Sequence, residues 1–225
     1  MEQIGFLSLC YHYIRPDNND PFSRIMGTKI TEFKNQIKML EEKFEMISLD
    51  DVLEFTNTKI FENNKHKMLI TFDDGLSDHY NAAKILNQFD IQATFFIPTC
   101  IMKEKLPANP MIIHYVIAKY GIERFLDEYR NALKKHRLEI EKYDITYVSG
   151  DDDVWKKIAE IKNNFKYRLG YKISRAILLY IYQNSLLIDS PEILEIIHLN
   201  RNQIREMLEM GHSIGVHTHT HISVA

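Results

Sequence analysis

The amino-acid sequence predicts an α/β fold in which a largely parallel sheet is interrupted by a long helical segment. Over the first 100 residues, short apolar runs alternate with segments whose apolar residues recur at helical spacing, as in consecutive β-α units. Between residues 107 and 210 strand signals almost vanish, and a strand-like run returns only near residue 212. With 225 residues, 45% of them hydrophobic, the chain is long enough to bury a substantial core.

Four strands are expected, near residues 6–14, 68–74, 91–98 and 212–218. Each is a short run rich in apolar, β-branched or aromatic residues, and turn residues such as Gly75 and Pro98 stand near the ends of the second and third. Because the intervening segments are long enough to cross over the sheet, we expect these strands to run parallel.

Helices are expected between the strands, each with one face for packing on the sheet. From Thr31 onward apolar residues recur at helical spacing (Phe33, Ile37, Leu40 and Phe44), and residues 82–89 show the same pattern. Ser48, followed three residues later by Asp51, resembles a capping signal for a short helix through Phe55, although Asp is a poorer match there than Glu or Gln.

The segment from Pro107 to about Met210 is predicted to be an insertion of four or five helices, too long for a plain crossover. Breaks are expected near Gly121, near Gly150, at Gly170 and at Ser190–Pro191, with Ser190 as N-cap and Pro191 in the first turn. The acidic cluster at 151–153 is interpreted as a helix N-terminus rather than a metal site. Gly211 is expected at the C′ position of the closing helix.

Composition excludes several classes of partner. The net charge is −3, from 28 Lys and Arg against 31 Asp and Glu, and no basic run could follow a phosphate backbone, so nucleic acid is not an expected partner. No apolar run is long enough for a membrane span. The two cysteines, Cys10 and Cys100, cannot build a disulfide framework, and the start of the chain does not resemble a signal peptide, which predicts a cytoplasmic location.

Asp73 and Asp74 are the first candidates for chemistry, because they stand at the carboxyl end of a buried strand, where α/β folds build their sites. Neighbouring side chains of an extended strand point to opposite faces, so both reach one site only if the chain turns there, which Gly75 permits. One carboxylate could then ligate a metal while the other takes a proton. Asp-Asp-Gly is also ordinary turn chemistry, so a purely structural role stays open.

His217, His219 and His221 form the second candidate group, directly after the last expected strand. Imidazole nitrogens combined with a carboxylate suit zinc. On a strand all three histidines share a face, whereas on a helical turn only His217 and His221 do. A solvated histidine-rich tail is the alternative, against which the alternating threonines and the preceding GHSIGV argue. Two histidines and one carboxylate would leave an open position for water.

Together these motifs resemble the polysaccharide deacetylase family, the NodB-homology deacetylases of carbohydrate esterase family four. The family motif T-F-D-D-G matches Thr71 to Gly75, and H-[ST]-x-x-H matches His217 to His221. The similarity extends over roughly residues 5–100 and 200–222. It implies a distorted (β/α) barrel, here divided into residues 1–103, a helical insertion at 104–199, and a return at 200–225 that carries the histidine motif.

Carried over position by position, the resemblance implies that Asp73 is the general base and that Asp74, His217 and His221 ligate a divalent metal, with zinc expected. His219 falls on a variable position and receives no role. The implied reaction removes N-acetyl groups from an amino sugar or polysaccharide, which makes the protein a hydrolase acting on non-peptide C–N bonds. Acetate and a free amine would be the products.

Three further family motifs, one of them carrying the general acid, follow the histidines in the family and have no counterpart after His221. We therefore expect an incomplete barrel, its first half only, with low activity of the 225-residue chain alone. A second copy or a partner chain would cover the open sheet edge. The alternatives are a catalytically inactive metal- or carbohydrate-binding scaffold, or half of a split enzyme that needs a partner chain.

The remaining histidines show no ligand spacing. His12 is interpreted as a structural or rim residue, and the others are expected at the surface or in the core: His66, His79, His114, His136 and His198. Trp155 is expected in the core of the insertion, with a sugar-stacking platform as the alternative.

Overall fold

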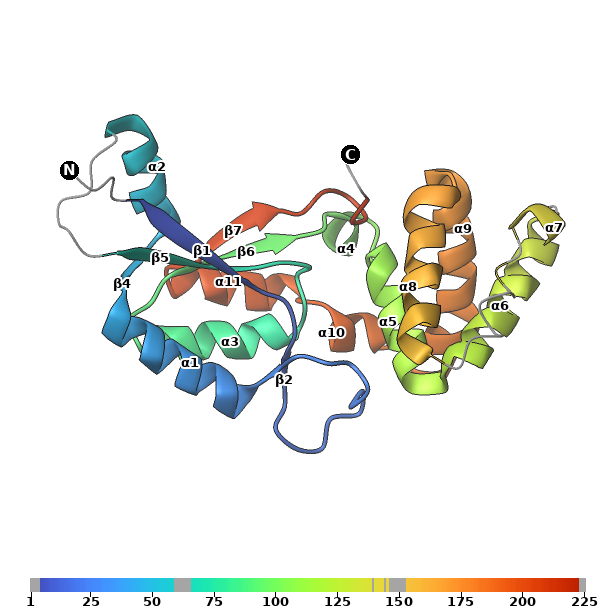
Figure 1. Ribbon diagram of the computed structural model, residues 1–225, viewed down its shortest axis with the longest axis horizontal. Helices are drawn as coiled ribbons and strands as arrows, with labels where there is room; N and C mark the ends of the chain where they lie inside the picture. Colours follow the sequence, from blue (N-terminus) through green and yellow to red (C-terminus); the bar gives the residue numbers. More distant parts are fainter. Residues whose placement is uncertain (1–4, 59–65, 139, 144, 146–152, 223–225) are drawn as a thin grey trace.

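The structure is a computed structural model that describes residues 5–58, 66–138, 140–143, 145 and 153–222 (Figure 1). In this part of the chain, five strands form one sheet in which every pairing is parallel, and helices pack against it. The predicted α/β class with a parallel sheet is therefore confirmed. A separate short pair, β2 (Ile14–Arg15) and β3 (Thr28–Lys29), lies outside the sheet.

The central strand of the sheet is β5 (Lys67–Phe72), which is buried along its whole length. β1 (Phe6–Tyr11) pairs with all of β5, while β4 (Glu45–Ile47) and β6 (Ala93–Ile97) pair with its first and second halves. β7 (Ser213–Val216) pairs with β6. Because these strands are parallel, the carboxyl ends of β1, β5, β6 and β7 meet at the same edge.

One face of the sheet is covered by α1 (Ile30–Lys43), α3 (Asp78–Asn87) and α11 (Arg201–Glu209), which lie below it in Figure 1. Phe33, Phe72 and Phe95 are fully buried between these layers, and the rings of Phe72 and Phe95 stack with centroids 4.6 Å apart. Burying such a side chain contributes roughly 1.5–3 kcal/mol. After α11, Gly211 has a φ of 88° at the predicted C′ position.

On the other face, α2 (Leu49–Thr58) covers a smaller cluster formed by Ile47, Val52 and Leu69. Its start shows the predicted cap. The Ser48 N–H donates to Asp51 Oδ2 (2.7 Å), and the Asp51 N–H donates to Ser48 Oγ (3.2 Å). Asp51 thus occupies the position and makes the hydrogen bond that Glu or Gln usually makes in a capping box.

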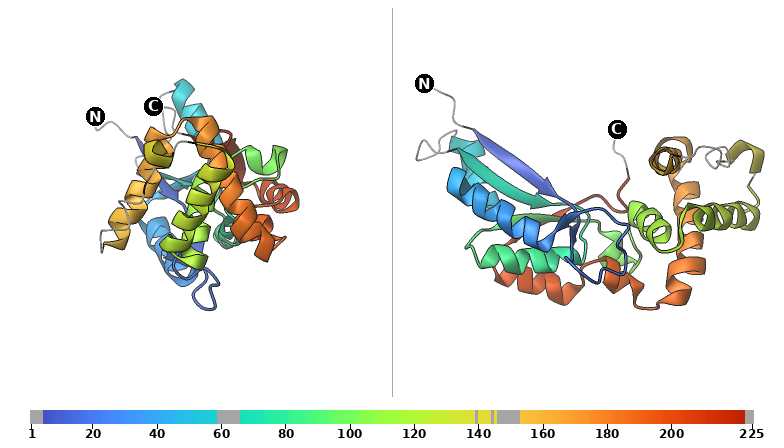
Figure 2. Two further views of the ribbon diagram at one scale, coloured as in Figure 1. Left: turned by 90° about the vertical axis from the view of Figure 1, so that its right-hand side faces the viewer. Right: turned by 60° about the horizontal axis from the view of Figure 1, so that its bottom comes forward.

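The remaining helices lie at or beyond the carboxyl edge of the sheet (Figures 1 and 2). They are α4 (Cys100–Lys103), α5 (Asn109–Tyr120), α6 (Ile122–Lys135), α7 (Ile140–Tyr143), α8 (Val154–Asn163), α9 (Tyr171–Tyr182) and α10 (Ile193–Ile197). Two π-helical segments, η2 (Asn164–Arg168) and η3 (Gln183–Leu187), continue α8 and α9. Phe125, Tyr129 and Ile177 are buried among these helices, which therefore pack their apolar faces against one another. We call α5 to α9, together with η2 and η3, the helical group.

The first strand is shorter than predicted. It ends at Tyr11 rather than near residue 14, because the Tyr13 carbonyl accepts a hydrogen bond from the Thr28 N–H and the chain leaves the sheet to pair with β3. This departure leaves His12 exposed at the sheet edge, in agreement with the rim position expected for it.

Two predictions between residues 104 and 199 are wrong. α10 begins at Ile193 after a turn, so Ser190 is not its N-cap, and the Ser190 carbonyl instead accepts the Ile193 N–H (3.0 Å). Trp155 is 62% exposed rather than in the core. Asp153 does cap α8, since its carboxylate accepts the N–H of Trp155 and Lys156, while residues 151 and 152 lie outside the described part.

Within the described residues no helix combines the length and the apolar character needed to cross a bilayer.

Candidate metal centre

Asp73 and Asp74 follow β5 at the edge where the parallel strands end. The Asp73 N–H donates to the Tyr11 carbonyl (3.1 Å), which keeps it in register with β1. The chain then turns sharply, because Asp74 and Gly75 have φ values of 79° and 58°. A Cβ added to Gly75 would lie 2.8 Å from Ile97 Cγ2, so only glycine fits here. This is the turn that two adjacent carboxylates need in order to face one edge of the sheet.

Asp74, His217 and His221 lie together although they follow different strands. His221 Nε2 is 3.0 Å and His217 Nε2 is 3.7 Å from Asp74 Oδ1, and the two imidazole rings have centroids 4.7 Å apart. One ligand atom from each residue lies within 4.8 Å of the other two. Asp74 is 3% exposed, whereas both histidines are partly exposed. The group therefore presents two nitrogens and one oxygen to a common point.

Asp74 Oδ1 is buried and makes no well-aligned hydrogen bond within the described residues, although His221 Nε2 lies 3.0 Å from it. A buried carboxylate oxygen without a hydrogen-bond donor or a bound cation destabilises the folded protein. Burial alone would raise the pKa of Asp74, but the imidazoles of His221, His12 and His217 hold this pKa below its ordinary value. The Asp74 carboxyl is therefore ionised at neutral pH and able to act as a ligand.

The histidine segment is held in a conformation that its residues rarely adopt. Thr218 and His221 have φ values of 57° and 61°. The Thr99 N–H, before α4, donates to the Thr218 carbonyl (3.1 Å), and the Asn109 N–H, at the start of α5, donates to the Thr220 carbonyl (3.2 Å). The His221 N–H donates to Thr218 Oγ1 (3.0 Å). Hydrogen bonds from two helix starts therefore fix the backbone that carries the candidate ligands.

His219 does not join this cluster. Its Nε2 lies 2.6 Å from Glu104 Oε1, and its Nδ1 lies 2.7 Å from Thr99 Oγ1. Glu104 Oε2 is in turn 3.3 Å from Arg175 Nη2, on α9. The family resemblance implies no role for His219. Its contacts with Thr99 and Glu104 give it a structural role, because they connect the histidine segment to the helical group through Arg175.

Two buried histidines contact backbone groups next to the site. His198 Nδ1 lies 3.1 Å from the Gly75 carbonyl, while His198 Nε2 accepts the Ala108 N–H (3.3 Å), so the neutral tautomer donates from Nδ1. His79 Nε2 lies 2.8 Å from the His12 carbonyl. Burial lowers the pKa of both histidines to about 4. Sequence reasoning placed both at the surface or in the core and missed these supporting contacts.

A cavity of about 530 Å³ lies beside Asp74 and His221, and an adjoining cavity of about 850 Å³ shares Asp74 with it. The helical group supplies much of the walls of both, including Met111, His114, Trp155, Lys162, Phe165 and Tyr171. Burial lowers the pKa of Lys162, while the charge of Asp74 acts in the opposite direction. Mixed apolar and polar walls of this kind are typical of sites for small molecules.

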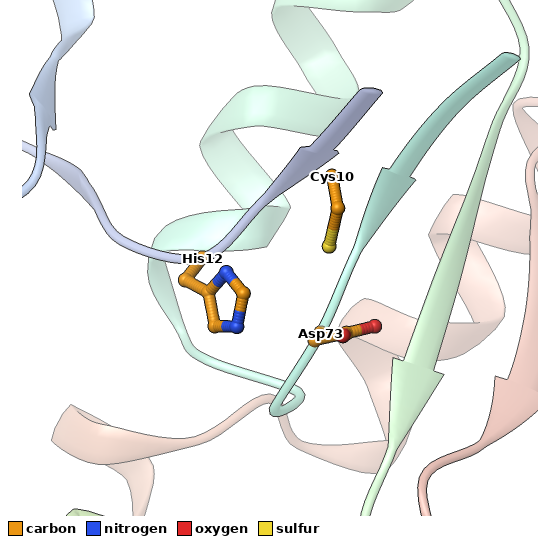
Figure 3. Close-up of side chains that lie close together, drawn as sticks. All are labelled: Cys10, His12 and Asp73. Atoms are coloured by element: carbon orange, nitrogen blue, oxygen red, sulfur yellow. The ribbon is translucent and has the colours of Figure 1, made fainter. Parts of the chain in front are cut away.

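Asp73 belongs to a second group of side chains, together with Cys10 and His12 (Figure 3). One ligand atom from each lies within 4.8 Å of the other two, and Cys10 and His12 are exposed. Partial desolvation of its sulfur raises the pKa of the Cys10 thiol, and the Asp73 carboxylate acts in the same direction. Sequence reasoning did not connect these residues, although the alternation of side chains along β1 places Cys10 and His12 on one face.

No family model matches the sequence, and no curated protein matches it. Among solved structures, IcaB from Ammonifex degensii is 24% identical, with a match that covers 42% of this chain and 38% of that chain at a TM-score of 0.35. The Streptococcus pyogenes deacetylase PplD in complex with acetate is 21% identical, with coverages of 46% and 47% and a TM-score of 0.35. A de-N-acetylase from Aggregatibacter actinomycetemcomitans is 17% identical, with coverages of 48% and 38% and a TM-score of 0.32.

The chain thus matches less than half of the length of each of these proteins, and the matches include deacetylases. At these TM-scores the likeness is partial, and the roles proposed below rest on the residues of this chain.

Proposed function

We propose that the protein is a metal-dependent hydrolase that removes N-acetyl groups from an amino sugar or polysaccharide. The observation that carries this proposal is the buried Asp74 Oδ1, which makes no well-aligned hydrogen bond among the described residues and lies beside the nitrogens of His217 and His221. The substrate class comes from the motifs that resemble those of polysaccharide deacetylases, Thr71 to Gly75 and His217 to His221.

The donor set fits a divalent cation, and zinc suits it well. Two imidazole nitrogens and one carboxylate oxygen are the kind of ligand set that catalytic zinc sites use, with a further position left for water or substrate. Asp74 is ionised and held by its turn, while His217 and His221 are fixed by the hydrogen bonds of their segment. When bound, the cation would polarise the acetamide carbonyl and lower the pKa of water.

The residues of the chain itself would then carry the hydrolysis. Asp73 lies outside the three-ligand group, so its carboxylate is available to accept a proton from the attacking water. The water oxygen bonds to the carbonyl carbon, the C–N bond breaks, and the proton ends on the amine, which gives acetate and an amino sugar. The cavity beside Asp74 would hold the sugar, with Lys162 and Tyr171 as donors to its oxygens.

The proposal extends to the surroundings of the sheet. Within the described residues β1 and β7 each pair on one side only, and Val216 is 68% exposed. We propose that this sheet belongs to a (β/α) barrel of the NodB type, whose open edge would be covered by a second copy or by a partner chain.

The test is acetate release from N-acetylglucosamine oligomers by the zinc-loaded protein. Asp73→Asn is expected to lower turnover by about 10²–10⁴-fold, the usual contribution of a general base, while the bound zinc is retained. The matched control is Asp90→Asn, an exposed residue whose φ of 56° asparagine also tolerates. Turnover that survives Asp73→Asn would contradict the role of Asp73. Zinc binding without any acetate release would instead favour a metal- or carbohydrate-binding scaffold, or half of a split enzyme that needs a partner chain.

A further inference from the structure

Cys10, His12 and Asp73 form a cluster separate from the three candidate ligands of the metal centre, although His12 lines the same cavities as Asp74 and Asp73 is the proposed base. Cys10 pairs with Thr71 and Tyr11 pairs with Phe72, so His12 and Asp73 are the next neighbours as the two strands end. Because side chains alternate along parallel strands, Cys10, His12 and Asp73 fall on one face of the sheet, opposite to buried Tyr11 and Phe72. Figure 3 shows the three side chains at these adjacent strand ends.

We propose that Cys10, His12 and Asp73 form a second binding site, selective for thiophilic divalent cations such as Zn²⁺ and Co²⁺. A thiolate, an imidazole and a carboxylate are all ligands of zinc, and one ligand atom from each lies within 4.8 Å of the others. On binding, the Cys10 thiol loses its proton to solvent and the sulfur bonds to the cation.

This second site differs from the Asp74 site in access and chemistry. Cys10 and His12 are exposed and Asp73 is partly exposed, whereas Asp74 is buried. Since solvent reaches the second site, its cation should exchange more readily and bind more weakly than the cation held by Asp74, His217 and His221. Only the second site contains sulfur, so a signal from a metal–thiolate bond distinguishes the two.

Occupancy of the second site has a consequence that rests on the proposed function. Asp73 is the proposed general base, and a carboxylate that ligates a cation no longer accepts a proton from water. Excess zinc should therefore inhibit hydrolysis by occupying the base, while the first zinc supports it. Binding of zinc by Cys10 and His12, together with Asp73, thus makes turnover depend on the concentration of free zinc.

Binding is tested by titration of the metal-free protein with Co²⁺, which gives a thiolate-to-cobalt charge-transfer absorption when sulfur is a ligand. Native mass spectrometry of the same samples counts the ions. The wild-type protein should bind two ions, with the absorption arising from the weaker one. Cys10→Ala should bind one ion without the absorption, whereas His217→Ala should keep the absorption. The matched control is Cys100→Ala, whose thiol is fully buried; it should behave as the wild type does.

Absence of the absorption in the wild type, or its persistence in Cys10→Ala, would overturn the second site. For the inhibition, zinc beyond the first equivalent should lower acetate release by about 100-fold in the wild type and leave Cys10→Ala active. Equal inhibition of both proteins would overturn the coupling. If the protein shows the cobalt–thiolate absorption but releases no acetate, the second site stands while the proposed hydrolysis by this chain fails, so the two failures are distinguishable.

Discussion

Asp73 and Asp74 are adjacent carboxylates in different surroundings. Asp74 is 3% exposed and lies against the imidazoles of His217 and His221, which keep its pKa low. Asp73 is partly exposed and stands beside Cys10 and His12. Because surroundings decide which of two carboxylates binds a cation and which accepts a proton, one Asp-Asp dipeptide can fill both roles once the turn at Gly75 separates them.

We predict that the stability of the fold decreases between pH 6.5 and pH 4, because His79 and His198 are buried in neutral form. Each has a pKa of about 4 in the folded protein, against 6.5 for an ordinary histidine. Over this window the unfolded chain binds a proton that the folded chain does not, so stability present above pH 6.5 is lost as the pH falls towards 4. The loss is at most on the order of 3 kcal/mol for each histidine.

Urea unfolding at a series of pH values across this window measures the slope. His198→Gln retains a donor and an acceptor but cannot titrate, so the slope should decrease by the contribution of one histidine. His66→Gln, at an exposed position, serves as the control and should leave the slope as it is. An unchanged slope in His198→Gln would mean that burial of neutral His198 does not drive the acid sensitivity.

Position directly after apolar strands made the two aspartates and the three histidines candidates, and the resemblance to the deacetylase motifs then singled out Asp73, Asp74, His217 and His221. The supporting histidines could not be found in this way. His198 contacts the Gly75 carbonyl across 123 positions, and no local pattern encodes such a pairing. Whether the four motif residues act as proposed stays a prediction for the experiments above.

At the scale of elements, the position of the histidine segment depends on α4 and α9 as much as on β7. His219 contacts Glu104, and Glu104 contacts Arg175, so a strand end, a short helix and the helical group are joined by one chain of contacts. Residues that orient a metal-binding segment without ligating the metal typically affect metal affinity.

We predict that Glu104→Ala weakens zinc binding at the Asp74 site by about tenfold, because the histidine segment loses its contact with the helical group. Competition with a zinc chelator measures the affinity. Glu42→Ala, an exposed glutamate on α1, is the matched control and should leave the affinity unchanged. If Glu104→Ala bound zinc as tightly as the wild type, the hydrogen bonds of the backbone alone would position the ligands.

We also predict that Lys162→Met lowers kcat/KM for N-acetylated oligosaccharides by about tenfold, the cost of one lost charged hydrogen bond to substrate. Lys162 lines both cavities that contain Asp74, so its ammonium group is in reach of a bound sugar. Zinc stoichiometry should stay at the wild-type value, and Lys34→Met, at an exposed position of α1, should change neither quantity. A change in zinc binding would indicate that Lys162 supports the metal centre instead.

Element boundaries followed from the sequence where local chemistry decides them. The reciprocal hydrogen bonds of Ser48 and Asp51 and the left-handed Gly211 are local, and both were predicted. The end of β1 was not, because it depends on the Thr28 N–H, which belongs to a distant segment. The start of α10 was missed for a different reason. Ser190 and Pro191 resemble a cap and a first helical turn in sequence, but they precede a turn, and the helix begins only at Ile193.

At the scale of the whole molecule, the carboxyl edge of the sheet faces the helical group (Figure 1). Residues of both parts line the two cavities. The sheet contributes Asp74 and the histidines, while α5, α8, η2 and α9 contribute much of the walls. Sequence periodicity predicted these helices but not their partner, because an amphipathic pattern shows that a face is buried without showing what covers it. The role of the helical segment as a wall of the site therefore emerged only from the structure.

The most direct test of the central claim is native mass spectrometry of the protein titrated with zinc, compared with Asp74→Ala and His217→Ala. We expect one tightly held zinc per chain, which both substitutions abolish, and a second, weaker zinc that both variants keep. If the protein held no tight zinc, or if the tight zinc survived both substitutions, Asp74, His217 and His221 would not be a metal centre, and the proposed hydrolysis would lose its basis.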